Sequence, residues 1–173
     1  VESPFMSSEI TILELSENVI SIPNYIFQDA EMTLDSLTIT ADSVGASAFH
    51  SSDISIGKLI IAENVSAFVT DISGESLAFA YNVIDKVFYN ATAAGMDLPK
   101  TGTYGPFRSA DITTFLVGEN VTFLDNYLLR SSTFTDCYVY AITTDDMSWK
   151  ETYVELTAQG ILMGDLPNAN NVW

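Results

Sequence analysis

The sequence predicts a solenoid in which a short unit recurs and one strand from each unit joins a long parallel β-sheet. The main observation is the similarity between residues 10–30 and residues 112–132, where apolar residues coincide at seven aligned positions. The tripeptide Glu-Asn-Val falls at the same place in both segments and occurs again at residues 63–65. A unit of this size buries its apolar face only by stacking on its neighbours, which is typical of solenoids.

The repeats begin at apolar residues spaced 22 to 28 positions apart. The predicted starts are Ile10, Leu34, Ile56, Ile84, Ile112 and, for a partial sixth repeat, Phe134. This spacing lies within the roughly 20 to 29 residues expected of leucine-rich repeats. The organisation that follows is an N-terminal cap or linker over residues 1–9, repeats over 10–140, and a C-terminal cap and tail over 141–173.

Each repeat is expected to contribute one strand. The fourth and sixth positions of each repeat are inward candidates, namely Leu13/Leu15, Leu37/Ile39, Leu59/Ile61, Val87/Tyr89, Phe115/Val117 and Cys137/Val139. An apolar residue at every second position indicates a strand with one buried face. Because no hairpin turns separate the strands, we expect them to pair in parallel and to line the concave side of the solenoid.

The return half of each repeat is expected to be irregular or to contain a short helix. It ends in a small residue followed by an aromatic one, at Ala48-Phe49, Ala78-Phe79 and Pro106-Phe107, with Ile26-Phe27 and Leu128-Leu129 as variants. A large ring at constant phase predicts an aromatic spine behind the sheet. Two repeats are longer, with insertions near residues 69–76 and 92–105. A right-handed parallel β-helix is the alternative fold, and more than one strand per coil would indicate it.

The repeated residues resemble the BspA-like leucine-rich repeat family, whose pattern is an apolar strand, a polar turn with Val, and then Ile-Gly-x-x-Ala-Phe. The segment VGASAF at 44–49 is the closest copy, and IPNYIF at 22–27 and LDNYLL at 124–129 are looser ones. The resemblance covers residues 10–140. It implies an exported, surface-associated protein of the kind found in bacteria and some parasitic protists, with a role in adhesion. A fold alone does not define a function.

The composition excludes several partner classes. Six basic and 23 acidic residues give a net charge of −17, which disfavours binding to nucleic acids and to anionic membrane surfaces. No apolar run is long enough to span a bilayer. The chain has one cysteine, so it has no internal disulfide. We expect no cofactor and no metal site.

The outward strand positions contain the candidate binding residues. Position five gives an apolar stripe of Ile60, Phe88, Leu116 and Tyr138, which Tyr140 extends at position seven. At about 4.8 Å per strand the stripe is about 15 Å long, and exposed patches of this kind mark partner sites. Lys58 and Lys86 should be neighbours at position three. We expect nearby acidic residues to neutralise them, and contact with a ligand carboxylate or sulfate is the alternative.

These features predict a non-catalytic, extracellular or cell-surface binding module that recognises a protein or glycan. The alternative is a structural spacer within a larger surface protein, with homotypic contacts along the stripe. An enzyme would have to place its acids in the insertions, at residues such as Asp71, Glu75 or Asp97. His50 is the only histidine, and Cys137 falls at an inward position, which favours a core thiol over a nucleophile.

Overall fold

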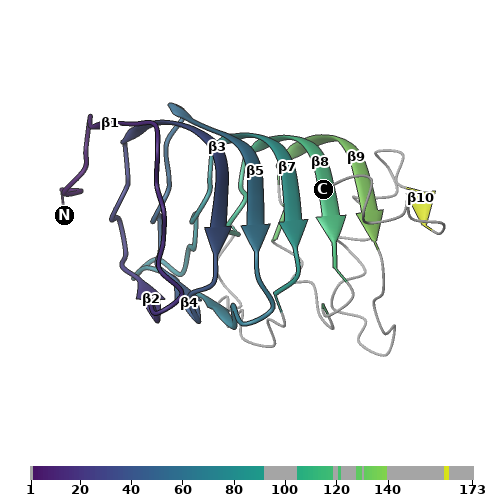
Figure 1. The fold of residues 1–173 in the computed structure, drawn as a ribbon, viewed down its shortest axis with the longest axis horizontal. Helices are drawn as coiled ribbons and strands as arrows, with labels where there is room; N and C mark the ends of the chain where they lie inside the picture. The colour runs from purple at the N-terminus through teal and green to yellow at the C-terminus, as the bar shows by residue number, and fades with distance from the viewer. Residues whose placement is uncertain are drawn as a thin grey trace.

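The computed structural model shows a coil of stacked turns, with a long parallel sheet along one side (Figure 1). It describes residues 2–91, 105–118, 121, 128–129, 131–139 and 162–163. The main sheet has seven strands in the order β1-β3-β5-β7-β8-β9-β10, and every neighbouring pair is parallel. The strands are β1 (Glu9–Ile10), β3 (Glu31–Ile39), β5 (Ile54–Ile61), β7 (Val83–Tyr89), β8 (Asp111–Val117), β9 (Thr133–Val139) and β10 (Leu162–Met163).

The register of the sheet confirms the phase predicted for repeats two to six. Their first apolar residues pair in one row, which runs Leu34, Ile56, Ile84, Ile112 and Phe134. The inward residues at positions four and six are buried in β3, β5, β7 and β8. The side chains that follow the strand period therefore form the core of the solenoid.

The predicted start of the first repeat is wrong by two residues, because Ile10 pairs with Met32 rather than with Leu34. Leu15 lies five residues after Ile10, whereas Ile39, at the equivalent repeat position, lies seven residues after Met32. The first coil is therefore too short to follow β3 residue by residue. Its strand ends at Ile10, and residues 11–15 run beside β3 without joining the ladder.

The ladder is interrupted at one position near the start of every long strand. The paired residues pass from Leu34↔Ile56 directly to Ser36↔Lys58, so Asp35 and Gly57 are skipped, and the same position is skipped between the following strands. In β3 both Asp35 and Ser36 are exposed, which interrupts the alternation of faces. A Cβ atom at Gly57 would lie 2.7 Å from the Asp35 carbonyl oxygen, so this close approach of the two backbones requires glycine.

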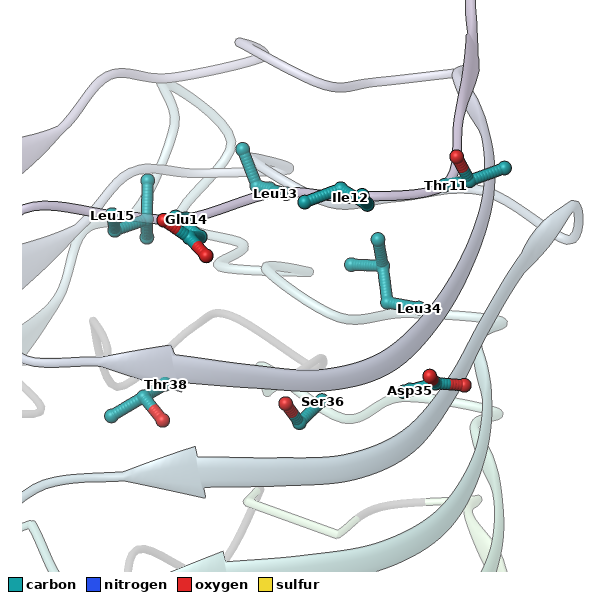
Figure 2. A pocket seen from close by; sticks show the side chains of 9 residues that line it. All are labelled: Thr11, Ile12, Leu13, Glu14, Leu15, Leu34, Asp35, Ser36 and Thr38. Carbon is teal, nitrogen blue, oxygen red and sulfur yellow. The ribbon is translucent and has the colours of Figure 1, made fainter.

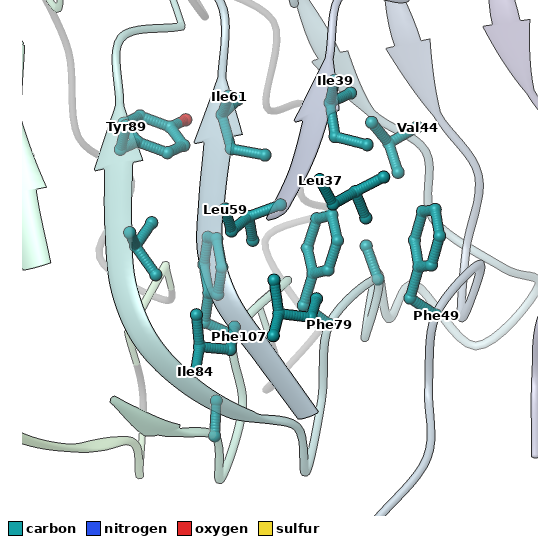
Figure 3. Close-up of a cluster of buried hydrophobic side chains, with 14 of the residues drawn as sticks. Leu37, Ile39, Val44, Phe49, Leu59, Ile61, Phe79, Ile84, Tyr89 and Phe107 are labelled. Carbon is teal, nitrogen blue, oxygen red and sulfur yellow. The ribbon is translucent and has the colours of Figure 1, made fainter. Parts of the chain in front are cut away.

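The predicted aromatic spine is confirmed. The rings of Phe27, Phe49, Phe79 and Phe107 stack in sequence with centroid separations of 5.2, 5.1 and 5.3 Å. Phe5 extends the stack at the N-terminal end, 5.0 Å from Phe27. The spine packs against the inward aliphatic side chains of the sheet (Figure 3).

The return segments of the described residues consist of turns and short strands, with no helix. A second parallel sheet contains β2 (Ser21–Ile22), β4 (Ser43–Val44) and β6 (Ala67–Phe68). The expectation of a single strand per coil is thus wrong in the first three coils, and their second strand is the feature expected of the alternative, a parallel β-helix. Strands of two residues are too short to show a period in the sequence. Their apolar members Ile22, Val44 and Phe68 face the core, and stacking of the coils brings their backbones into pairing distance.

Backbone groups in the turns also pair from coil to coil. The amides of Phe27, Phe49 and Phe79 donate to the carbonyls of Ala48, Ala78 and Pro106 in the next coil, at 2.7 to 2.8 Å. The fully buried side-chain amide Nδ2 of Asn82 donates to the carbonyls of Phe49 and Ser51 at 2.8 and 2.9 Å, across the inserted loop of the third repeat. These bonds tie the turns of one coil to those of the next.

Loss of one aromatic ring from the spine should lower the stability of the fold. Phe79 stacks on rings at both sides and is fully buried, so Phe79→Ala is expected to lower the free energy of unfolding by about 3 to 5 kcal/mol. Urea unfolding followed by circular dichroism measures this. Ile72→Ala is the control, because Ile72 is fully exposed (108%) and its truncation should change the stability by less than about 0.5 kcal/mol. Equal effects of the two substitutions would show that the spine does not stabilise the fold.

Candidate functional site

The outward side of the sheet places the predicted binding residues in two rows. One row contains Thr38, Ile60, Phe88, Leu116 and Tyr138, and the other contains Ser36, Lys58, Lys86, Thr114 and Asp136. The side chain of Tyr138 and the whole of Tyr140 lie outside the described residues. The structure therefore brings Lys58, Lys86, Ile60 and Phe88 together on β5 and β7, and we refer to these four residues as the β5–β7 patch.

The apolar stripe is narrower than expected. Ile60 and Phe88 are half-buried, but Leu116 is only 5% exposed, so the expectation that it would be accessible is wrong. Leu116 lies in an interior strand with Phe88 directly beside it on β7. A side chain between bulky neighbours loses its exposed surface even when it points away from the core. The accessible apolar surface of the described row is therefore that of Ile60 and Phe88.

The two lysines are direct cross-strand neighbours, as predicted. Both are half-buried, and no carboxylate in the described part of the chain lies within ion-pair distance of either ammonium group. The acid in their row, Asp136, is separated from Lys86 by the strand that carries Thr114. The expected neutralisation by nearby acids therefore does not take the form of a direct ion pair among the described residues. Like charges in direct opposition across a ladder destabilise a sheet, so this pair weakens the fold at this point.

The first insertion is organised by one carboxylate. Asp71 Oδ1 accepts hydrogen bonds from the Ser73 amide and hydroxyl at 2.8 and 2.6 Å and from the Glu75 amide at 3.1 Å. Partial burial raises the pKa of Asp71. The hydrogen bonds from the Ser73 side chain and from the loop amides lower it by a larger amount, so the resulting pKa is below its usual value. An acid tuned in this direction is suited to holding a loop rather than to donating a proton. Asp97 lies outside the described residues.

The other two candidate residues have structural surroundings. The His50 ring packs edge-on against Tyr81, with centroids 5.3 Å apart. Cys137 is 3% exposed, which confirms its predicted inward position, and burial raises the pKa of its thiol to about 12. Among the residues that the structure describes, no group of three or more His, Cys, Asp or Glu side chains has a metal-binding arrangement. No helix in that part of the chain is long and apolar enough to cross a bilayer.

Comparisons with protein-family models, with curated proteins and with solved structures find no match to this chain. The residues and geometry of the chain itself are therefore the basis for any assignment of function.

The Cys137 thiol should be unreactive in the folded protein. With a pKa of about 12, its thiolate fraction at pH 8 is about 10⁻⁴, and the thiolate is the reactive form. We expect labelling by iodoacetamide at pH 8 to be at least tenfold slower than in guanidinium chloride. Rapid labelling of the folded chain, with circular dichroism unchanged, would contradict the buried position.

The loop around Asp71 should depend on the ionised carboxylate. Because the folded pKa is lowered, the contribution of Asp71 to stability is present above the usual pKa near 3.8 and is lost as pH falls through the folded value. Asp71→Ala should speed amide exchange at Ser73 and Glu75 at neutral pH, which NMR can measure. Exchange in the sheet should be unchanged. If these two amides exchange at the same rate in the wild type and in Asp71→Ala, the carboxylate does not order the loop.

Proposed function

We propose that this chain is a non-catalytic binding module of the BspA-like leucine-rich repeat type, displayed outside the cell. It recognises a protein or glycan through the outward face of its parallel sheet. The repeat spacing, the VGASAF segment and the stacked rings of the return turns support this repeat type. The second sheet of two-residue strands is, in the first three coils, the feature that indicates the alternative fold, a parallel β-helix. In either fold the binding residues lie on the outward face of the main sheet.

The single observation that carries the proposal is the pairing of Lys58 with Lys86. A repeat sequence can place almost any polar residue at an outward position, yet this acidic chain puts two of its six basic residues side by side. The described structure offers no acidic partner for them. A ligand with a carboxylate or sulfate group would remove the repulsion on binding, and part of the binding free energy would come from that relief.

The neighbouring row defines the rest of the ligand. Ile60 and Phe88 follow the two lysines by two residues on the same strands, so they lie on the same face, about 7 Å further along. The β5–β7 patch therefore presents two cations beside one aliphatic and one aromatic side chain. An acidic sugar or a sulfated glycan has this pairing of an anionic group with an apolar ring face, and so does an acidic residue next to an aliphatic one in a protein.

The test separates binding from stability. Purified protein is applied to an array of extracellular-matrix proteins and of carboxylated, sulfated and neutral glycans. Lys58→Gln/Lys86→Gln should lose at least tenfold in affinity for any ligand found, while its melting temperature stays the same or rises, because a repulsive pair has been removed. Arg108→Gln is the control, since it removes a cation in a return turn, where Arg108 lies 6.0 Å from the Tyr81 ring centroid.

Two results would reject the proposal. Ligands whose affinity is unchanged by the double substitution would place recognition elsewhere on the chain. An array on which the wild type binds nothing, together with self-association that the double substitution or Phe88→Glu abolishes, would favour the alternative of a spacer with homotypic contacts.

A further inference from the structure

A groove separates the first coil from the sheet (Figure 2). It has a volume of about 430 Å³ and lies between residues 11–15 on one side and Leu34, Asp35, Ser36 and Thr38 of β3 on the other. It exists because the first coil is two residues short and leaves the ladder after Ile10. The groove is therefore a direct consequence of the register of this chain.

The β3 wall of the groove is an open strand edge. The Met32 amide donates to Asp53, and the Ile39 carbonyl accepts from the Ala62 amide, so the backbone groups of these residues point toward β5. Backbone groups of alternate residues in a strand point to opposite edges. Since the Ile39 carbonyl points toward β5, the N–H and C=O groups of Ser36 and Thr38 point toward the first coil. No residue of the described first coil forms a backbone hydrogen bond with them. An edge of this kind is a template for another strand.

The charged side chains that line the groove are acidic, and the nearest described cation in the register, Lys58, lies one strand away on β5. Glu14 and Asp35 line the groove and are exposed. An adjoining hollow of about 450 Å³ shares Thr11 with the groove and is lined by Glu9, Glu31 and Asp53. Glu9 and Glu31 are directly paired across β1 and β3, a like-charge contact that disfavours the empty state. Nine acidic residues and no Lys or Arg precede Lys58 in the sequence.

The inner side of the groove is apolar. Leu13 and Leu15 are only partly buried and pack against the core, and the groove also reaches Leu34 (Figure 2). A strand placed along β3 would point alternate side chains toward these leucines and the others toward the exposed carboxylates. The segment that fits this environment therefore alternates apolar and basic residues.

We propose that the groove receives an extended segment of a partner protein, with lysine or arginine at every second position and apolar residues between, which adds to the edge of β3 as a strand. The backbone groups of Ser36 and Thr38 supply the hydrogen bonds, and Glu14 and Asp35 select the basic side chains. The main-chain pairing provides affinity and the alternating side chains provide specificity. This site is independent of the proposed function, because it lies at the N-terminal edge of the sheet and has the opposite charge to the β5–β7 patch.

The probe is a fluorescein-labelled six-residue peptide that alternates lysine and valine, followed by fluorescence anisotropy with the full chain. Two control peptides accompany it: one alternates glutamate and valine, and the other keeps lysine and valine but has N-methylated amides along one edge. We expect binding of the first peptide only, with slower amide exchange at Ser36 and Thr38 measured by NMR. Glu14→Gln/Asp35→Asn should weaken binding about fivefold.

A matched variant controls for net charge. Glu17→Gln/Asp42→Asn removes the same two charges at exposed positions outside the groove and should leave the affinity unchanged. Equal binding of the N-methylated peptide would overturn strand addition, since the attraction would then be electrostatic alone. Equal weakening by both double variants, or no peptide binding at all, would also overturn the proposal. Light scattering provides a further test: self-association of the chain through this edge that the peptide does not displace would also overturn the proposal.

Discussion

The structure depends on the stacking of one coil on the next. No single coil can enclose a core, so each strand and each turn must meet its equivalent in the neighbouring coil. Strands in a sheet are about 4.8 Å apart, and the stacked rings of Phe27, Phe49, Phe79 and Phe107 are 5.1 to 5.3 Å apart. Because these two distances nearly agree, backbone pairing and ring packing are satisfied by the same translation along the solenoid.

This requirement explains which positions are intolerant of change. Gly45 is one, because a Cβ atom there would lie 2.4 Å from the backbone nitrogen of Asn24 in the preceding coil. Asn82 is another, because its amide reaches back to two carbonyls on the far side of an inserted loop. The loop itself is tolerated because only residues 70–75 leave the stack, whereas Val69 and Ser76 bond to Val44 and Ser47 of the preceding coil, and Asp71 closes the loop. Variation in length is thus confined to segments that do not take part in coil-to-coil contact.

The same constraint determines how much of the fold was predictable. The alternation of apolar and polar residues predicted the register from Leu34 to Phe134 correctly, because a shift of one residue would expose the side chains of the core face. The interruption of the ladder at Asp35 was missed, although its signal was present: Leu34 and Leu37 are both inward and lie three residues apart, which a period of two does not allow. The offset of the first coil and the burial of Leu116 could not be read from periodicity, since both depend on which neighbouring residues the chain brings into contact.

The register of the strands also places the charged residues on two distinct surfaces. Five acidic residues lie around the open edge of β3, and the two lysines of the following strands are neighbours on β5 and β7. The five are Glu9, Glu14, Glu31, Asp35 and Asp53. Because each strand adds about 4.8 Å, the two surfaces lie about one to two strand spacings apart. The two proposed sites would therefore select partners of opposite charge over a short distance. The like-charge contacts at both places, Glu9 with Glu31 and Lys58 with Lys86, weaken the free protein, and each would be relieved by a partner of the opposite sign.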